Sequence, residues 1–365
     1  MHRRDGTRQV FCGATAVGGG APVSVQSMAN VPPHDVEALA AQALACEAAG
    51  CDIFRLTVPD ADAAKALGEV RRRTSMPIVA DIHFDWRCAL AAIEAGADAL
   101  RLNPGNIGSQ DRVREVARAA AAKKVPIRVG VNLGSLQRDL DAKVRAGAMR
   151  APEALCESAM QHVALLEAEG FRDIVVSAKA SNVPDTVETY RMLAERTDCP
   201  LHLGVTEAGT LLPGAVRSAV ALGILLSEGI GDTIRVSLTA PPEREVAAGA
   251  EILRSLSLRA PGPSITSCPT CGRTRVDLFK VAAEVEQAME ALYREKTREL
   301  GRAPENFPKV AVMGCAVNGP GEAKGADVAL CGGDGDFLVF RRGVAAGRVD
   351  AAGAARKVVE HVVSL

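Results

Sequence analysis

Short apolar runs alternate with longer amphipathic stretches along the chain up to about residue 260. The same order of residues occurs four times: an amphipathic stretch ends at Gly, Asp follows within one to three residues, and an apolar run comes next that ends in polar residues. The four segments are EAAGCDIFRLTV, EAGADALRLN, AEGFRDIVVSAK and SEGIGDTIRVSL. This order is typical of a helix followed by a buried parallel strand. Together with VSVQSM, IVADIH, IRVGVN and LHLGVTE, it predicts eight strands, starting near Val23, Ile53, Ile78, Ala99, Ile127, Ile174, Leu201 and Thr233.

The spacing of these strands indicates how they connect. Successive starts lie 21 to 47 residues apart, which is enough for one crossover helix and its two loops. The longest gap should hold an extra loop or helix around Asp139 to Pro152. A doubly wound sheet uses the same units, but no G-x-G-x-x-G follows the first strand, and eight strands close a barrel. We therefore predict an α/β fold, a (β/α)8 TIM barrel over residues 1–260.

The pattern changes at PGPSITS, residues 261–267, whose two prolines and one Gly indicate a linker. The sequence beyond it predicts a long helix from about Asp277 to Arg298, a strand KVAVMG, a Gly-rich loop CAVNGPGEAKGA, strands DVALCG and DFLVFRR, and a closing helix near Ala351 to Val363. We expect these elements to form a second, small α+β domain over residues 261–365.

Composition narrows the class of protein. The chain is 48% hydrophobic and 24% charged, which excludes a disordered protein. Aromatic residues make up only 3%, and 43 Lys and Arg stand against 44 Asp and Glu, so we expect no nucleic-acid binding. No apolar run approaches 18 residues without a charge or Gly, and MHRRDGTRQVFCG lacks the apolar part of a signal peptide. We expect a cytoplasmic protein that does not bind membranes.

Cationic side chains recur at the carboxyl ends of the predicted strands, where barrel enzymes carry their active sites. One such arginine is commonly part of a surface salt bridge. Five cations on five strands are different, because each unpaired ion in one mouth would cost several kcal/mol. Asp81 and Glu207 cannot balance five charges, so the pattern predicts a polyanionic small molecule, and guanidinium groups suit a diphosphate. The five cations are Arg55, Arg101, Arg128, Lys179 and Arg235.

Other polar residues at the strand ends are further candidates. Glu207 would stand where a general acid or base is useful, although a carboxylate ringed by arginines stays ionised and can serve only to orient them. Asn132 and His83 also follow predicted strands and would face the mouth. A lone His in a strand is often a hydrogen-bonded core residue, which is the interpretation we favour for His202.

Cys268 and Cys271, in CPTC, are the two of the ten cysteines that have the spacing of ligands on one turn. A zinc ribbon would repeat C-x-x-C, whereas here a single Cys315 follows in MGCAVNGPGEA, with Glu322 as the nearest oxygen ligand. Three thiolates and one weaker ligand fit a [4Fe–4S] cluster that keeps one iron exchangeable. Cys331 lies in an apolar strand, where it is expected to be a buried hydrophobe.

A structural zinc site with three cysteines is the alternative to the cluster. Gly319, Pro320 and Gly321 count against it, because they predict a flexible loop that a closed zinc site would not need.

QSMANV, ADIHFD, LRLNPGNIG, IRVGVNLGSL, VSAKAS, HLGVTEAG, EGIGDTIRVSL, CPTCGR and GCAVNGPGEA together resemble the bacterial 4-hydroxy-3-methylbut-2-en-1-yl diphosphate synthases, in the same order from about Val23 to the end of the chain. The resemblance implies that the barrel binds 2-C-methyl-D-erythritol 2,4-cyclodiphosphate and opens it reductively, with two electrons from flavodoxin or ferredoxin. It implies Glu207 as the acid/base residue and Asn318 as a residue facing the substrate. The substrate-binding residues that it implies are Arg55, Arg101, Arg128, Asn132 and Lys179. The [4Fe–4S] ligands that it implies are Cys268, Cys271, Cys315 and Glu322.

The resemblance also implies a homodimer in which the cluster domain of one chain covers the barrel mouth of the other. The chain departs from the family after the first strand, where Ala29–Pro33 replaces a Thr-Asn-Thr stretch and two hydroxyl groups are missing. On the residues alone, two other functions stay open. One is a pterin-type condensing enzyme with a zinc-bound tail, and the other is a zinc-stabilised interaction module, against which the five strand-end cations count.

Overall fold

The computed structural model describes residues 4–365, and the chain divides into two compact units between Arg259 and Ala260. The first unit is a (β/α)8 barrel, as predicted, and each predicted strand start lies within one residue of an observed one. The strands are all parallel, in the order β8-β7-β6-β5-β4-β3-β10-β9. A parallel bridge between Val176 and Leu201 joins the two strands at the ends of this order, β8 and β9, and closes the barrel. The strands are β3 (Ser24–Met28), β4 (Ile53–Thr57), β5 (Ile78–Asp81), β6 (Ala99–Leu102), β7 (Ile127–Asn132), β8 (Ile174–Lys179), β9 (His202–Leu203) and β10 (Thr233–Ile234).

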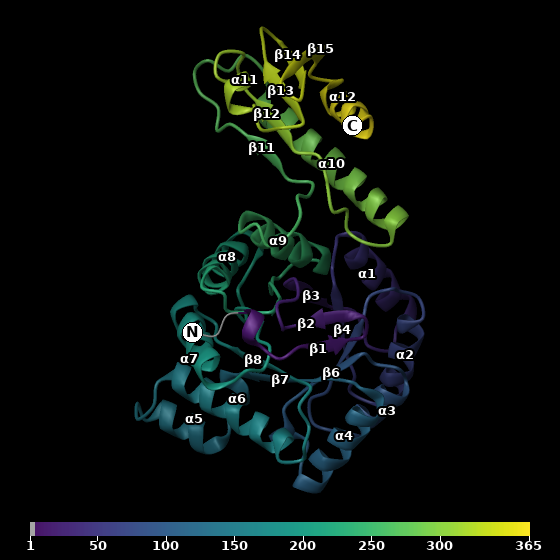
Figure 1. Cartoon of the computed structure of the whole chain (residues 1–365), viewed down its shortest axis with the longest axis vertical. Helices are drawn as coiled ribbons and strands as arrows, with labels where there is room; N and C mark the ends of the chain where they lie inside the picture. The colour runs from purple at the N-terminus through teal and green to yellow at the C-terminus, as the bar shows by residue number, and fades with distance from the viewer. Residues whose placement is uncertain (1–3) are drawn as a thin grey trace. The chain divides into compact units, whose positions relative to one another are not determined.

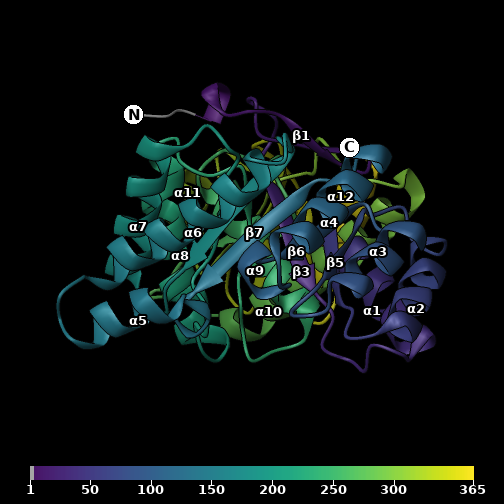
Figure 2. The same ribbon diagram turned by 90° about the horizontal axis from the view of Figure 1, so that it is seen from below.

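Helices cover the outside of this barrel (Figures 1 and 2). Short turns of 3-10 helix follow two strands, η2 (Pro104–Asn106) after β6 and η3 (Leu133–Ser135) after β7. The longest gap, where an extra loop or helix was expected, holds α5 (Arg138–Arg145). The surrounding helices are α1 (Val36–Ala48), α2 (Ala61–Arg71), α3 (Trp86–Glu94), α4 (Gln110–Lys123), α6 (Ala151–Glu167), α7 (Val183–Arg196), α8 (Leu211–Ser227) and α9 (Pro242–Ser255).

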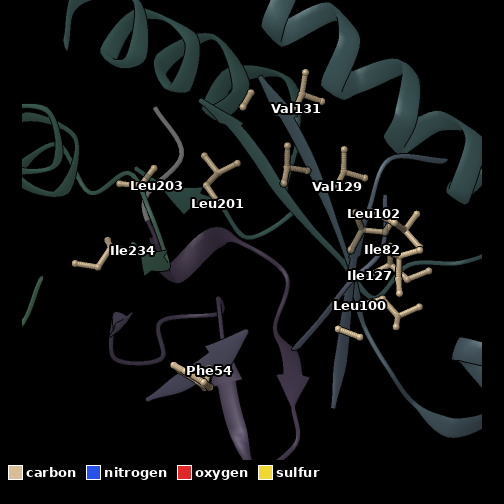
Figure 3. Packing of buried hydrophobic residues seen from close by; sticks show 14 of the residues in the cluster. Phe54, Ile82, Leu100, Leu102, Ile127, Val129, Val131, Leu201, Leu203 and Ile234 are labelled. Carbon is tan, nitrogen blue, oxygen red and sulfur yellow. The ribbon is translucent and has the colours of Figure 1, made fainter. Parts of the chain in front are cut away.

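The alternation of side chains along each strand decides which residues face the barrel interior. Leu100 and Leu102 belong to the apolar core between the strands and the helices, together with Phe54, Ile127 and Val129 (Figure 3). The residues between them in sequence therefore point inward. This register turns the strand-end cations into the barrel, because the apolar positions on either side of each one are buried against helices.

A hairpin that the sequence analysis did not predict closes the other end of the barrel. It consists of β1 (Val10–Cys12) and β2 (Thr15–Val17), which pair antiparallel. Its buried side chains pack on an inner layer of apolar residues from four strands, namely Ile53, Val79, Ala99 and Val175. The amino-terminal end of the barrel is thus filled by apolar side chains, and the polar part of the interior begins above this layer.

The second unit is a five-stranded sheet with helices on it. The strands β11 (Ile265–Ser267), β12 (Val310–Met313) and β13 (Val328–Gly332) run parallel, and β14 (Asp336–Arg341) and β15 (Val344–Asp350) continue the sheet antiparallel. The helices α10 (Leu278–Leu300) and α12 (Ala354–Val363) pack in one apolar cluster with the sheet. Ala323, which follows α11 (Gly319–Glu322), lies in a second cluster with other side chains of β12 and β13.

Three expectations for this unit were wrong or incomplete. Residues 261–267 are not only a linker, because Ile265–Ser267 forms β11 beside β12. The loop expected to be flexible at Gly319–Gly321 forms the helical turn α11, and a Cβ at Gly319 would lie only 3.0 Å from Cβ of Met313 and 3.1 Å from Sγ of Cys331, so the neighbours would have to shift to admit one. The strand β15 was not predicted.

In residues 4–365 no helix is both long enough and apolar enough to cross a bilayer.

Candidate functional site

The carboxyl ends of the barrel strands surround a cavity of about 820 Å³. A smaller cavity of about 90 Å³ lies deeper in the barrel, and Arg55, Arg101 and Asn132 line both. His83, Asp81 and Asn103 line the larger cavity. The smaller one is lined by the other cations of the set, Arg128, Lys179 and Arg235. The structure therefore gathers the five predicted cations at one mouth, together with Asp81, His83 and Asn132.

Asp81 is the buried anion at the centre of this group. Its carboxylate lies 3.2 Å from Nη1 of Arg101 and 3.7 Å from Nε of Arg55, with Nε2 of His83 at 3.8 Å. Burial acts to raise the pKa of Asp81, but the charges of Arg55 and Arg101 outweigh it and hold that pKa below its usual range. Burial lowers the pKa of Arg55 to about 10. Asp81 is therefore ionised and fixes two arginines in the mouth.

Two strand glycines make room for these cations. Nη2 of Arg101 donates a hydrogen bond of 2.6 Å to the carbonyl oxygen of Gly130. A Cβ at Gly130 would collide with the Arg101 guanidinium, and a Cβ at Gly204 would come within 2.6 Å of Nζ of Lys179. The glycines of IRVGVN and LHLGVTE thus mark where the cations cross the barrel interior.

Arg128 and Lys179 lie deepest in the barrel. Arg128 donates to Oε1 of Gln26 at 3.2 Å, and Nζ of Lys179 lies 3.2 Å from Nε2 of His202. Burial, followed by the charges of neighbouring arginines, holds the pKa of both Arg128 and Lys179 well below the usual values. The same causes keep the pKa of His202 low, so this imidazole is neutral and accepts a hydrogen bond from Lys179. His202 is a core residue under the site.

Glu245, which the sequence analysis missed, is the second buried carboxylate. It comes from α9 and lies 3.3 Å from Nε of Arg235, while it accepts hydrogen bonds from Ser27 Oγ at 2.9 Å and Leu238 N at 2.9 Å. Arg235 and Arg55 also both contact the sulfur of Met28. Within residues 4–365, the five cations of the mouth have ion pairs with two carboxylates, so three positive charges are left uncompensated.

Glu207 does not have the surroundings that the sequence suggested. It is exposed, it has a left-handed backbone conformation with φ of 54°, and no ion pair links it to an arginine in the described part of the chain. Its neighbour Thr206 lines the deeper cavity. Glu207 is therefore next in sequence to a residue of the cavity wall, but it does not neutralise the cations of the mouth. Asp81 and Glu245 neutralise them.

His162 supports the loops that form one wall of the larger cavity, and it was also missed. From α6, its Nδ1 accepts a hydrogen bond of 3.2 Å from the Gly105 amide, and its Nε2 lies 3.4 Å from the side chain of Gln137. The loops that these two residues belong to contribute Asn106 and Leu136 to the cavity wall. Burial lowers the pKa of His162 to about 4, so it stays a neutral acceptor at neutral pH.

The predicted cluster ligands lie at one edge of the second sheet. Cys268 follows β11, Cys315 follows β12 by two residues, and these strands are parallel neighbours, so both thiols emerge at the same edge. Glu322 ends the helical turn after Cys315, and both Glu322 and Asn318 are exposed. Arg273 interacts with three of these residues. Its pKa is raised by a hydrogen bond to Cys271 and then by the charges of Cys271, Cys315 and Glu322.

The surroundings of these thiols suit thiolates. The Gly314 amide lies 3.2 Å from Sγ of Cys268. The pKa of Cys315 is lowered by hydrogen bonds from the backbone amides of Asn318 and Val317, and that of Cys271 by hydrogen bonds from Arg273. In contrast, burial raises the pKa of Cys331 to about 11, as expected of a core residue. Thiolates with N–H donors directed at sulfur are the donor set of iron–sulfur clusters.

A zinc ion and a four-iron cluster place different demands on the spacing of their ligands, and across the described residues 4–365 no group of three Cys, His, Asp or Glu side chains that could hold one metal ion is found. A single zinc ion draws its ligands to about 2.0–2.3 Å from one centre. A four-iron cluster attaches each ligand to a different iron and therefore needs a wider set, which is compatible with ligands on two loops.

Comparison with known proteins gives a consistent result for both units. Residues 7–250 match the family model described as the GcpE TIM-barrel domain, and residues 264–364 match that of the GcpE protein C-terminal domain. The chain is 52% identical over 344 residues to the 4-hydroxy-3-methylbut-2-en-1-yl diphosphate synthase (flavodoxin) of Desulfotalea psychrophila, covering 94% of this chain and 91% of that one. It is 50% identical over 356 residues to the enzyme with this name from Geobacter sulfurreducens, covering 98% and 97%.

One solved structure that the chain resembles shares much less sequence with it. The dihydropteroate synthase of Yersinia pestis is 14% identical, covers 68% of this chain and 97% of its own, and has a TM-score of 0.47, so it does not bear on function.

Proposed function

The chain belongs to the GcpE family, whose two domain models match residues 7–250 and 264–364, and on this basis we propose which reaction its barrel mouth and its cysteines carry out. The reaction is the reductive ring opening and dehydroxylation of 2-C-methyl-D-erythritol 2,4-cyclodiphosphate to 4-hydroxy-3-methylbut-2-enyl diphosphate, a step of isoprenoid biosynthesis. The enzyme is thus an oxidoreductase, and the names of its relatives support flavodoxin as the electron donor in preference to ferredoxin.

The observation that carries this proposal is the uncompensated charge of the mouth. Five cations face two carboxylates in the part of the chain that the structure describes, and the deepest cations have lowered pKa values because they are buried. A bound diphosphate would supply the missing negative charge, and forked guanidinium groups can hold its oxygens in pairs. A scaffold protein or interaction module would gain nothing from this repulsion.

The residues of the mouth would have different roles in binding and opening the cyclic diphosphate. Arg55, Arg101, Arg128 and Lys179 would bind the phosphoryl oxygens and stabilise the negative charge that develops when the ring C–O bond breaks. Asn132 lines both cavities, so its amide could bridge the diphosphate and the carbon chain. His83 lines the outer cavity and would contact the same ligand.

Proton transfer is assigned to Glu207. Asp81 is unsuitable, because Arg55 and Arg101 keep it ionised. Glu207 has no ion pair in the described chain and is exposed next to the cavity wall, so it can exchange protons with solvent. The hydroxyl group that is removed needs a proton to leave as water, and Glu207 would deliver it.

The second unit would hold a [4Fe–4S] cluster through Cys268, Cys271, Cys315 and Glu322. The cluster, when bound, supplies two electrons one at a time and an iron that can take an oxygen ligand. The Glu322 carboxylate is the ligand most easily displaced, because oxygen binds such iron less firmly than thiolate. Asn318, in the same loop, would face the substrate. Arg273 and the amides after Cys315 would stabilise the thiolate charge.

Two further properties are part of the proposal. The relatives' flavodoxin-dependent reaction supports a cytoplasmic protein. We also propose that the protein is a homodimer.

Lys179→Met tests the anion site, with Lys143→Met, an exposed lysine on α5, as the matched control. Inorganic diphosphate should raise the thermal midpoint of the wild type and of the control, because a ligand that binds only the folded state stabilises it by RT ln(1 + [L]/Kd). Lys179→Met should require at least about tenfold more diphosphate for the same shift, since one buried charge-assisted hydrogen bond contributes about 1.5–3 kcal/mol. Its iron and acid-labile sulfide content, measured anaerobically, should stay at the wild-type level.

Two results would contradict the proposal. One is a diphosphate response that is equal in Lys179→Met and the wild type. The other is a colourless wild-type protein that contains zinc and no sulfide after anaerobic purification.

A further inference from the structure

A small cavity lies between the hairpin that closes the barrel and the cations of the mouth. Its volume is about 30 Å³. Val10 and Val17 of the hairpin line it, and so does Arg128, which also lines the deeper cavity of the mouth. This space is called the floor cavity below. The side chains with nitrogen or oxygen in its wall are Gln26, Arg128, His202 and Thr233.

Two buried atoms of this wall, Nδ1 of His202 and Oγ1 of Thr233, have no hydrogen-bond partner within residues 4–365. The two residues are 0% and 3% exposed. They are register neighbours on β9 and β10. The residues that follow them, Leu203 and Ile234, lie in the apolar core between strands and helices (Figure 3). Both polar side chains therefore point into the barrel, beside each other.

The contacts of the His202 ring decide which nitrogen carries its proton. Nε2 lies 3.2 Å from Nζ of Lys179 and accepts a hydrogen bond from it, since an ammonium group can only donate. The neutral ring therefore carries its proton on Nδ1. A buried N–H group without an acceptor is strongly unfavourable, and native proteins leave few such groups unpaired. The Nδ1–H group thus requires an acceptor in the floor cavity.

We propose that the floor cavity holds a bound water molecule, and that this water makes His202 a positioning residue for Lys179. The water accepts from Nδ1 of His202 and donates to Oγ1 of Thr233. It also donates to Oε1 of Gln26, which has a lone pair left beside the hydrogen bond that it accepts from Arg128. The role of Lys179 rests on the anion site proposed above, whereas the water itself does not.

The size and polarity of the floor cavity fit this ligand. A buried water needs roughly 10–15 Å³ of space and two to four polar partners. The cavity offers about 30 Å³ and side chains of both kinds, the Nδ1–H donor and the oxygens of Thr233 and Gln26. Cavities that stay empty in proteins are apolar. The two unpaired atoms in this wall therefore favour a filled cavity.

The water matters for the anion site because the tautomer of His202 decides how Lys179 is held. With the proton on Nδ1, the lone pair of Nε2 binds one of the three hydrogens of Nζ, which leaves two for phosphoryl oxygens. Without the water, the ring gains from carrying its proton on Nε2 instead. Two N–H donors would then face each other at 3.2 Å, and Nζ would have to leave this position.

A crystal structure of the full-length, cluster-loaded protein, at a resolution that shows ordered waters, tests the site directly. The expected result is one density peak in the floor cavity, about 2.7–3.2 Å from both Nδ1 of His202 and Oγ1 of Thr233. A cavity without density, or an Nδ1 that bonds directly to a protein atom, would overturn the proposal.

Thr233→Val tests the role of the water, because it replaces the hydroxyl by a methyl group of similar size. Thr189→Val, on α7, is the matched control, because Thr189 is also buried and its Oγ1 donates to the Asp185 carbonyl oxygen at 2.7 Å. Isothermal titration should show that Thr233→Val binds inorganic diphosphate about 3- to 10-fold more weakly. KM for the cyclic diphosphate should rise by the same factor with little change in kcat. The control should match the wild type in both measurements.

Thr233→Ser separates hydrogen bonding from packing. This variant keeps the hydroxyl and loses only a methyl group, so its diphosphate affinity should equal that of the wild type. A serine variant as weak as Thr233→Val would mean that packing, and not the water, explains the loss.

The urea midpoint of unfolding gives a reading that needs no ligand. If Oγ1 of Thr233 has no partner, Thr233→Val removes an unsatisfied buried hydroxyl and raises the midpoint. If Oγ1 binds the water, the same change takes a partner from it and lowers the midpoint. We expect the lower value, and a higher one would overturn the proposal.

Equal diphosphate affinity in Thr233→Val and the wild type would show that the water does not position Lys179. A wild type that does not bind diphosphate at all would instead contradict the anion site proposed above, and the role of Lys179 with it. The density in the floor cavity and the urea midpoint would still decide whether the water is present.

Discussion

Replacing Asp81 by Asn removes the charge that holds two arginines in the barrel mouth while keeping the shape of the side chain. With an effective dielectric constant of about 20, a carboxylate attracts a cation at 3–4 Å by about 4–5 kcal/mol. Arg101 at 3.2 Å and Arg55 at 3.7 Å each have an attraction of this size to Asp81. Part of the sum is offset by the desolvation of the buried carboxylate. Breaking a buried ion pair by removing one partner is therefore expected to destabilise the folded barrel by about 3–5 kcal/mol.

The free energy of unfolding from urea titration measures this effect. Asp62→Asn is the matched control, because Asp62 forms an exposed pair with Lys65, and its replacement should leave stability nearly unchanged. The mouth of Asp81→Asn gains one more uncompensated positive charge, so saturating inorganic diphosphate should stabilise this variant more than the wild type. If Asp81→Asn is as stable as Asp62→Asn, or if diphosphate stabilises it less than the wild type, the charge balance derived for the mouth is wrong.

Three other predictions concern the loop support, the cluster ligands and the pH dependence of stability. His162→Leu removes the acceptor for the Gly105 amide, so it should raise KM for the cyclic diphosphate about 3- to 10-fold with little change in kcat. His162→Asn should restore KM, because its side-chain oxygen can accept this hydrogen bond in the place of Nδ1. Glu322→Cys should keep the brown colour and iron content but lose most turnover, because a fourth thiolate closes the exchangeable iron; near-normal turnover would exclude an exchangeable site at Glu322. The pKa of Asp81 is lower in the folded state than its unfolded value of about 3.9, so its contribution to stability is complete above that pH and is lost as pH falls through the folded pKa. The stabilities of the wild type and Asp81→Asn should therefore differ fully at pH 7 and converge only as the pH is lowered below about 3.9 and through the folded pKa.

The barrel was predictable because its signal is repeated. The same order recurs along the chain: an amphipathic helix that ends at Gly, an Asp shortly after it, and a short apolar strand. Within a strand, buried apolar neighbours such as Leu100 and Leu102 show that Arg101 between them points the opposite way, into the barrel. The hairpin Val10–Val17 was not predictable in this way, because its strands have three residues each and are stabilised by the inner layer of the barrel. The strand Val344–Asp350 is exposed along nearly its whole length, so it has no alternation of apolar and polar residues.

The sequence predicted that charged residues at the strand ends would lie together, and it missed site residues that come from helices. Asp81 and four of the five cations lie in strands, and Arg235 follows one directly, so barrel topology brings them together. Glu245 lies in PEREVAAG among other charged helical residues, and only its contacts with Ser27 and Arg235 identify it as buried. His162 lies in the middle of α6, where sequence alone cannot tell that it accepts from the loop after β6. Glu207 was expected among arginines, but it is exposed and has a left-handed backbone conformation, which the sequence does not show.

Turnover under anaerobic conditions is the most direct measurement of the central claim. Protein purified without oxygen would be mixed with reduced flavodoxin and the cyclic diphosphate, and the products identified by mass spectrometry. The predicted result is one 4-hydroxy-3-methylbut-2-enyl diphosphate for every two electrons consumed, with competitive inhibition by inorganic diphosphate. An iron-loaded protein that binds diphosphate but leaves the cyclic diphosphate unchanged would contradict the account.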